Sequence, residues 1–239
     1  MFKENLDAVT RLVGTPISFL AEISLQFKKL DSLFGNKYKQ AVEKNDKIIA
    51  YLQNEISRHK QTIDYENEPR DFIDAYLQEM KRREKMNNLE EFTEKQLTIA
   101  AYDFFAAGLD TTATTCRAFI LYILYYPEVQ SKIHEEMDNI IGKEHIITTS
   151  DQVRLPYLTA AMQELQRVAV LMPMNIHHIV LEDVQMGKNK VPKGTIVIPQ
   201  FQSVHQDPDI YPGKMPTIKY TTGLIRAPEP FKCRAIPRN

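Results

Sequence analysis

Apolar residues recur at helical spacing through the first half of the chain. In both 38–60 and 70–85 they fall on one side of a helix, with charged residues between them. This period predicts two amphipathic helices, and the polar, acidic stretch 62–69 predicts a break between them. The apolar positions are Ala41, Ile48, Ile49, Leu52 and Ile56 in the first helix and Phe72, Ile73, Tyr76, Leu77 and Met80 in the second.

A longer apolar run occupies residues 93–126. Thr93, with Gln96 three residues later, fits a capping box, so we expect the helix to begin there. Pro127 ends the run and suits the first turn of a further helix, which we expect to reach about residue 141, just before Gly142.

The second half of the chain mixes helical and β patterns. A short segment opens at 150–152, and 158–170 predicts a helix that stops before Pro173. The β-rich runs 176–180 and 194–198 are bounded by Gly and Pro and predict strands. The chain as a whole is therefore expected to be mainly α with a small β-sheet.

Composition narrows the class of protein. The 239 residues are 43% hydrophobic and 26% charged with a net charge of −1, which is typical of a globular protein and does not indicate nucleic-acid binding. Cys116 and Cys233 are too few for a disulfide framework. We expect no signal peptide and no membrane anchor in this chain. Residues 14–23 are apolar but short; we expect a buried helix or loop, with a membrane-surface contact as the alternative.

Residues 104–115 place a glycine, an acid and several threonines inside the long apolar helix. Gly costs about 1 kcal/mol relative to Ala in a helix interior, and a carboxylate is costly to bury. Small residues would let a flat ligand approach the backbone, and an acid beside a hydroxyl could deliver protons. The alternative is a bent helix whose threonines bond to its own carbonyls. Helical spacing puts five residues on one side: Phe104, Ala107, Asp110, Thr111 and Thr114.

A second candidate pair is Glu164 and Arg167, whose i, i+3 spacing places them on one helix face. The alternative is an ordinary surface ion pair worth about 0.3–0.5 kcal/mol.

Several segments, taken in order, carry a resemblance to a known family. They are PRDFIDAYL at 69–77, AGLDTT at 107–112, YPEVQ at 126–130, LPY at 155–157 with E-x-x-R at 164–167, VPKGT at 191–195 and DP at 207–208. Together they resemble the cytochrome P450 family of haem-thiolate monooxygenases, most closely its animal microsomal branch. The resemblance covers roughly residues 40 to 212, and a set in this order has a low risk of chance matching.

The resemblance implies a partial cytochrome P450 fold with roof helices, a long central helix, an E-x-x-R helix and a β segment. It implies haem b as cofactor, with Ala107 and Gly108 lining the oxygen pocket over the haem. Asp110 and Thr111 are implied to relay protons to the bound dioxygen.

Other roles also come only from the resemblance. Glu164 and Arg167 are implied to form a buried ion pair that locks the core on the far side of the haem. His178 aligns with a position that often approaches a haem propionate; the alternative is that His177 and His178 are ordinary strand residues.

The C-terminal part departs from the family's pattern. The family holds its iron with a cysteine in a loop resembling F-x-x-G-x-R-x-C-x-G, and no such loop follows Pro212. Cys233 lacks neighbouring glycines, so we do not expect it to bind the iron, and we expect Cys116 to be a small buried hydrophobe. Residues 213–239 carry six basic residues against one acid and predict an irregular tail outside the family. We expect residues 1–212 to form a partial catalytic domain, truncated at both ends relative to the family.

Three functions follow as hypotheses. The first is a haem-dependent monooxygenase that inserts one oxygen atom of O2 into an apolar organic substrate. The resemblance implies electrons from NADPH through NADPH–cytochrome P450 reductase, and location at the endoplasmic reticulum membrane. The second is a non-catalytic fragment or pseudoenzyme that lacks the haem-ligating cysteine loop. The third is an unrelated helical binding protein, which the ordered motifs disfavour.

Overall fold

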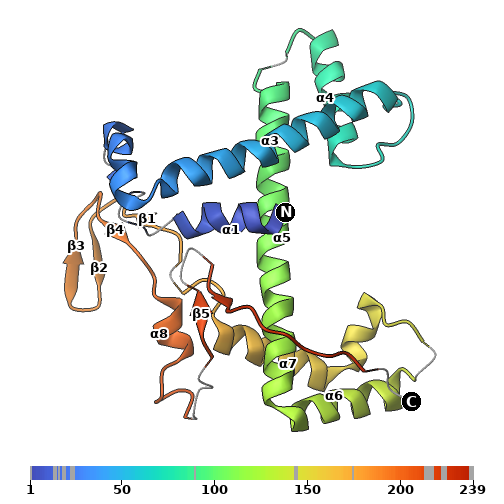
Figure 1. The fold of residues 1–239 in the computed structure, drawn as a ribbon, viewed down its shortest axis with the longest axis vertical. Helices are drawn as coiled ribbons and strands as arrows, with labels where there is room; N and C mark the ends of the chain where they lie inside the picture. The colour runs from blue at the N-terminus through green and yellow to red at the C-terminus, as the bar shows by residue number, and fades with distance from the viewer. Residues whose placement is uncertain are drawn as a thin grey trace. The chain divides into compact units, whose positions relative to one another are not determined.

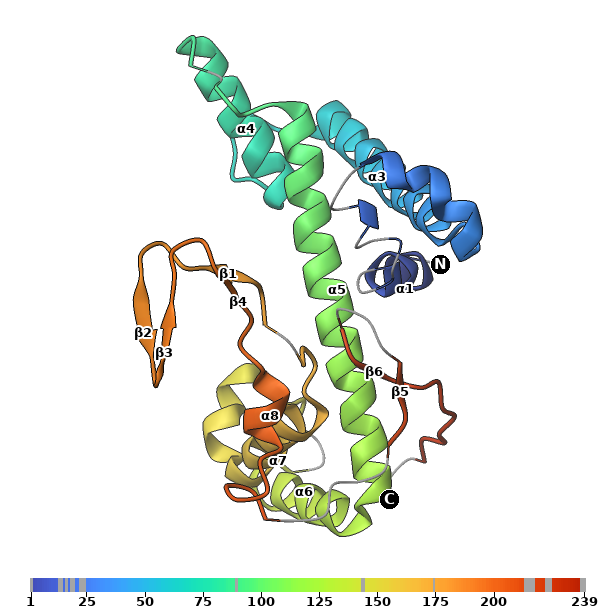
Figure 2. The same ribbon diagram turned by 90° about the vertical axis from the view of Figure 1, so that its left-hand side faces the viewer.

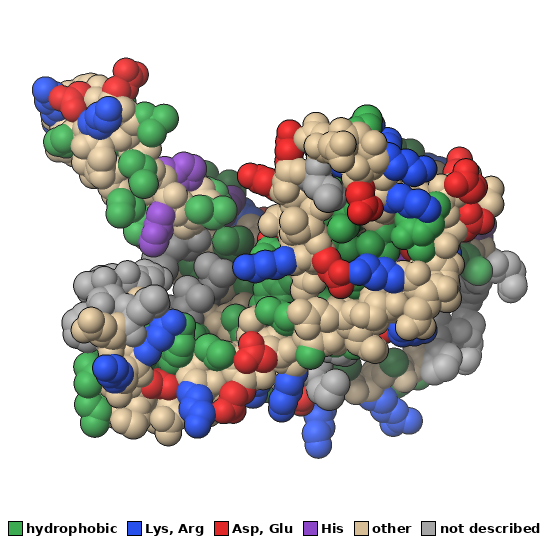
Figure 3. Space-filling model, turned by 90° about the horizontal axis from the view of Figure 1, so that it is seen from above, with side chains coloured by type: hydrophobic (Ala, Val, Ile, Leu, Met, Phe, Trp, Pro, Cys, Tyr) green, Lys and Arg blue, Asp and Glu red, His purple; other side chains and the backbone are tan. Residues whose placement is uncertain are grey.

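The computed structural model describes residues 2–12, 15, 17, 20–21, 25–88, 90–142, 145–173, 175–212, 218–221 and 225–236 (Figure 1). The chain divides into two compact units, Met1–Thr112 and Ala113–Asn239, and helix α5 (Glu94–Tyr125) continues from the first into the second. The described elements are mostly helices with a few short strands, as the sequence predicts. On the face drawn in Figure 3, acidic and basic side chains are interspersed with hydrophobic ones.

The first unit is helical. It contains α1 (Phe2–Leu12), the 3-10 helix η1 (Leu25–Phe34), α3 (Lys37–Thr62), α4 (Phe72–Lys85) and the first part of α5. The predicted helices 38–60 and 70–85 are thus confirmed with ends shifted by up to two residues. Two apolar clusters hold these helices together: Leu6, Ile48, Leu52 and Ala101 join α1, α3 and α5, and Ile56, Leu77 and Leu97 join α3, α4 and α5.

Helix starts in this unit follow from capping side chains. Asp71 accepts hydrogen bonds from the backbone N–H groups of Ile73 and Asp74 at 2.9 and 3.1 Å, so α4 begins at Phe72 rather than at residue 70. Thr93 accepts the Gln96 N–H at 3.1 Å, which is the half of the predicted capping box made by the threonine.

The second unit contains the remainder of α5, then α6 (Pro127–Ile140), the 3-10 helix η2 (Thr149–Arg154), α7 (Pro156–Ala169) and α8 (Phe201–His205). Pro127 begins α6 as predicted, and α7 begins two residues before the predicted 158. Figures 1 and 2 both show α6 and α7 beside the end of α5, where Ala118, Leu165 and Ala169 form a buried cluster.

Three two-stranded antiparallel ribbons complete the described part of this unit. The predicted strands pair with each other: β1 (His178–Ile179) lies beside β4 (Ile196–Val197), with His178 opposite Val197. The sequence analysis missed the hairpin of β2 (Val184–Met186) and β3 (Asn189–Val191). Gly187, at φ +58°, sits in its tight turn, where glycine adopts the left-handed backbone without strain.

The tail beyond residue 212 is more ordered than the sequence predicts. Its described residues include β5 (Tyr220–Thr221) and β6 (Ala227–Pro228), which pair antiparallel. The Tyr220 and Tyr122 hydroxyls lie 2.7 Å apart, and Arg117 donates to the Pro228 carbonyl at 3.0 Å. The expectation of an irregular tail is therefore wrong for residues 220–221 and 227–228, whose pairing is supported by polar groups on α5.

The apolar stretch 14–23 lies partly outside the described residues. Within it, Ile17 is fully buried and Ala21 is 9% exposed, as expected for a buried segment. Among the described residues, no helix combines the length and the apolar character needed to cross a lipid bilayer.

Candidate functional site

The predicted site on α5 contains an exposed surface of small and aromatic residues. Phe104 is 67% exposed, and Ala107 and Gly108 are also exposed. A Cβ built at Gly108 meets no heavy atom of the described residues within 4 Å, apart from the nearby backbone of its own helix. The backbone of α5 is therefore open to a flat ligand at this point.

The acid and the threonines of this segment do not all share that surface. Asp110 is 4% exposed and Thr114 is fully buried, so the prediction of one common face is wrong for these two residues. The reason is that the buried side of α5 changes along its length. Ala101 packs within the first unit, whereas Ala118 packs against α7 in the second.

Thr111 makes the back-bond that the alternative interpretation requires. Its hydroxyl donates to the Ala107 carbonyl at 2.8 Å, one turn earlier. The helix nevertheless continues from Glu94 to Tyr125. Because the hydroxyl proton is directed to the backbone, the oxygen can still accept a hydrogen bond from a ligand.

Glu164 and Arg167 form a bidentate ion pair on α7. The Arg167 Nη2–Glu164 Oε1 distance is 2.6 Å, and Nε lies 2.8 Å from Oε2. The hydrogen bond from Arg167 lowers the pKa of Glu164 below its usual value. The Arg167 side chain is 14% exposed, which makes it half-buried, and that of Glu164 is 59% exposed, so the prediction of a buried ion pair is wrong.

Arg167 also connects α7 to the chain that follows α8. It donates a short hydrogen bond to the His205 carbonyl, and its guanidinium lies 4.1 Å from the centroid of the Tyr211 ring. Through this cation–π contact and the hydrogen bond, Arg167 links α7 to a segment about 40 residues later in the chain. The sequence did not predict the roles of Tyr211 and of the His205 carbonyl, because neither residue lies in a recognisable motif.

Glu164 is exposed because it faces a cavity of about 690 Å³ within the second unit. The cavity is mostly apolar and rich in tyrosine, and Glu164 and Arg167 are its charged residues. Its remaining lining residues are Phe119, Tyr122, Ile123, Tyr126, Val129, Tyr157, Ala160, Ala161, Leu165, Val168, Ile210, Tyr211 and Pro212.

The remaining candidate residues lie apart from these features. His178 is an exposed residue of β1, and His177 directly before it is exposed as well. Cys233 is exposed in the irregular segment 229–236. Cys116 is also exposed, so the expectation of a buried hydrophobe is wrong; it lies on α5 between the buried Thr114 and Ala118, which face another direction.

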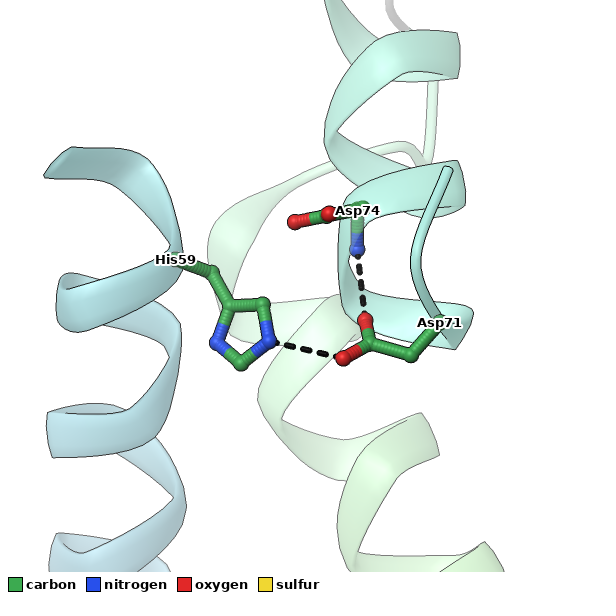
Figure 4. Close-up of side chains that lie close together, drawn as sticks. All are labelled: His59, Asp71 and Asp74. Atoms are coloured by element: carbon green, nitrogen blue, oxygen red, sulfur yellow. Dashed lines mark hydrogen bonds and ion pairs between the residues drawn. The ribbon is translucent and has the colours of Figure 1, made fainter. Parts of the chain in front are cut away.

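The sequence analysis missed a cluster of titratable residues in the first unit. His59 on α3 contacts Asp71, and Asp74 lies beside them on α4 (Figure 4). One potential ligand atom from each residue lies within 4.8 Å of the others. The acidic residues around the break at 62–69 were the feature of the sequence that could have indicated this cluster. Their spacing along the chain alone does not show that His59 lies beside them.

The cofactor that the resemblance implies fits this chain only in part. The exposed Ala107–Gly108 surface fits a planar group. The cysteines do not fit as the iron ligand: Cys116 points outward from the middle of a helix, and the described residues after Cys233, 234–236, contain no helix. Among the described residues, a planar group would therefore find an open surface at Ala107 and Gly108, but neither cysteine lies in a loop that leads into a helix.

Comparison with known proteins agrees with the resemblance. The sequence model of the family described as Cytochrome P450 matches residues 1–213. A Caenorhabditis elegans protein named "Probable cytochrome P450 CYP36A1" is 42% identical over 170 residues, which cover 70% of this chain and 34% of that protein.

Two mammalian proteins are similarly related. Rabbit (Oryctolagus cuniculus) cytochrome P450 2C5 is 35% identical over 209 residues, covering 87% of this chain and 41% of the relative. Human cytochrome P450 2U1 is 37% identical over 164 residues, covering 69% and 30%. The chain thus spans well under half the length of these curated relatives. With the family model matched over most of its length, the chain belongs to the cytochrome P450 family.

Proposed function

We propose that this chain supplies the oxygen side of a haem-dependent monooxygenase. The reaction of the whole protein would be insertion of one oxygen atom of O2 into an apolar organic substrate, with electrons from NADPH delivered by NADPH–cytochrome P450 reductase. The observation that carries the proposal is the open backbone surface at Ala107 and Gly108, within a segment that matches the family's A-G-x-D/E-T-T signature. Haem b is the flat cofactor that would lie there.

From the family resemblance, Asp110 and Thr111 are proposed to hold and move protons within this segment of α5. The Thr111 hydroxyl is fixed by its bond to the Ala107 carbonyl, so its oxygen is a positioned acceptor. Asp110 is buried next to it in sequence, and its carboxyl group can exchange a proton with a hydroxyl or water at the helix. Their position on one rigid helix would keep the two groups in fixed relation.

Glu164 and Arg167 are proposed to act in support of the fold. Arg167 joins α7, α8 and the Tyr211 segment, and this junction would fix the part of the chain that follows the E-x-x-R helix. His178 is proposed as a contact for an acidic group such as a haem propionate, because its imidazole is exposed on β1. Location at the endoplasmic reticulum membrane is proposed from the family resemblance alone.

A non-catalytic role is the second candidate. It is favoured by the exposed Cys233, which stands in an irregular segment without a cradle for a thiolate–iron bond. In that case the chain would keep the family's scaffold without its oxygen chemistry.

Haem titration of the purified full chain tests the proposal. Gly108→Leu would fill the open surface and is expected to weaken haem uptake at least about tenfold, equivalent to about 1.4 kcal/mol. The matched control is Gly108→Ala, which adds one methyl group in open space and favours the helix by about 1 kcal/mol. Equal haem affinity in the wild type and Gly108→Leu would refute the proposed surface.

The two candidate functions are separated by the spectrum of the CO-bound ferrous protein. A Soret band of the thiolate-ligated type that is lost in Cys233→Ser and retained in Cys116→Ser would support the monooxygenase. Haem uptake without that band in the wild type would support the non-catalytic role.

A further inference from the structure

His59 lies at the corner between α3 and α4, and both of its ring nitrogens are engaged. Its Nδ1 is 2.8 Å from the Glu55 carbonyl oxygen, one turn earlier on α3. Its Nε2 is 2.8 Å from Oδ2 of Asp71, the residue that caps α4 (Figure 4). The side chains are 18% exposed for His59 and 47% exposed for Asp71, so the imidazole is the more enclosed partner.

Both partners of the ring can only accept hydrogen bonds. A backbone carbonyl has no proton, and an ionised carboxylate has none either. A neutral imidazole carries one N–H, so either tautomer would direct a lone pair at an acceptor oxygen. Only the imidazolium donates to both partners, and the geometry is therefore that of a charged His59.

The two oxygens of Asp71 have separate tasks. Oδ1 accepts the N–H groups of Ile73 and Asp74 and caps α4, whereas Oδ2 faces His59. Loss of the positive charge on His59 would therefore weaken the link between α4 and α3 while leaving the cap in place. The cap and the link can be separated by experiment for this reason.

The neighbouring charges are mostly paired. On α3, Arg58 pairs with Glu55, and Lys60 pairs with Glu94 of α5. Across the corner, Arg70 makes bonds to both carboxylate oxygens of Asp74, whose side chain is 3% exposed.

Asp71 is the acid that contacts His59 directly, and Asp74 adds a weaker attraction. Burial opposes the charge on His59, but bonds to the Glu55 carbonyl and to Asp71 outweigh it, and the pKa of His59 is raised above 6.5. Burial likewise opposes the charge on Asp71, yet the Asp74 N–H and His59 lower the pKa of that carboxyl group.

The same three residues could be taken for a metal site, since their ligand atoms lie within 4.8 Å of one another. Arg70 argues against this, because its guanidinium occupies the Asp74 oxygens that a cation would need. A further positive charge would have to displace an arginine already bound in bidentate fashion.

We propose that His59 and Asp71 form a proton-dependent clasp that holds the start of α4 against the end of α3 when His59 is charged. This inference does not depend on the proposed haem chemistry. The clasp stabilises the first unit fully below the ordinary pKa of histidine, and this stabilisation is lost as pH rises through the raised pKa of His59. At the acid end it is lost as pH falls through the lowered pKa of Asp71.

NMR titration of the imidazole Cε1–Hε1 signals in the full chain tests the clasp. The His59 signal is assigned by its loss in His59→Gln. The midpoint of His59 is expected to lie above the ordinary histidine value of about 6.5 in the wild type, and to fall in Asp71→Asn. That variant keeps an acceptor oxygen for the α4 cap. A His59 midpoint at or below about 6.5, or one unchanged in Asp71→Asn, would overturn the proposal.

Urea unfolding of the first unit as a function of pH gives a second readout. Relative to His59→Gln, the wild type is expected to lose stability as pH rises from the ordinary pKa of histidine through the raised pKa of His59. The control is His177→Gln, which changes a residue of the second unit and should leave the unfolding of the first unit unchanged. Parallel curves for the wild type and His59→Gln would count against the clasp. So would chelator-reversible Zn²⁺ binding that requires His59, because it would identify a metal site instead.

Discussion

Removal of one hydroxyl group should reveal whether the tail hairpin is part of the second unit. In Tyr220→Phe, the Tyr122 hydroxyl loses its 2.7 Å partner on β5. Burial and this hydrogen bond together raise the pKa of Tyr122, whose side chain is half-buried. A hydrogen bond contributes about 1 kcal/mol net, and leaving a buried partner unsatisfied adds to the loss. We expect Tyr220→Phe to destabilise the second unit by about 1–2 kcal/mol.

Two measurements report this loss. One is urea unfolding followed by circular dichroism, and the other is hydrogen exchange of the α7 amides under native conditions. The matched control is Tyr125→Phe, because Tyr125 is on the same helix but 55% exposed; its effect should stay within about 0.5 kcal/mol. If both variants change the unfolding free energy equally, the hairpin does not dock on α5 in solution and the reasoning fails.

Two further predictions concern packing and the ion pair on α7. Leu97→Ala should cost about 2–5 kcal/mol in urea unfolding of the first unit, because Leu97 is fully buried at the junction of three helices, whereas Ile99→Ala at a 42% exposed position should cost much less; similar losses would contradict the packing. Arg167→Ala should destabilise the second unit more than Glu164→Ala, since the arginine also holds the carbonyl that ends α8 and the glutamate is 59% exposed. A larger loss from the glutamate variant in thermal unfolding would contradict this order.

The helices were predictable because the apolar face of each helix is also the face that is buried. Ile48, Leu52 and Ile56 recur at helical spacing, and all three are buried between α3 and its neighbours. The strands of β1 and β4 were predictable from their β-branched residues. The β2–β3 hairpin was not, because its strands are short and mostly exposed and show no alternation between buried and exposed positions.

The residues of the candidate site could be named from the sequence, but the sequence did not show which of them share one exposed surface. A periodicity argument assumes that one side of a helix stays buried along its whole length. In α5 the partners change near residue 110, so Asp110 and Thr114 are buried although Phe104 is exposed. The exposure of Glu164 has a similar origin, because its surroundings are set by residues 210–212 and by a cavity rather than by α7 itself.

The hairpin beyond the family match shows why composition did not predict its contacts. A helix ends with carbonyl groups that have no partner within the helix, and any nearby donor can bond to them. Arg226 supplies two such donors near the end of α7. Its backbone N–H donates to the Leu171 carbonyl at 2.8 Å, and its guanidinium donates to the Ala169 carbonyl at 3.3 Å. The same guanidinium lies 3.8 Å from the centroid of the Tyr220 ring, so the residue directly before β6 contacts β5. The basic residues that suggested a tail without a fold are thus of the kind that a helix C-terminus attracts.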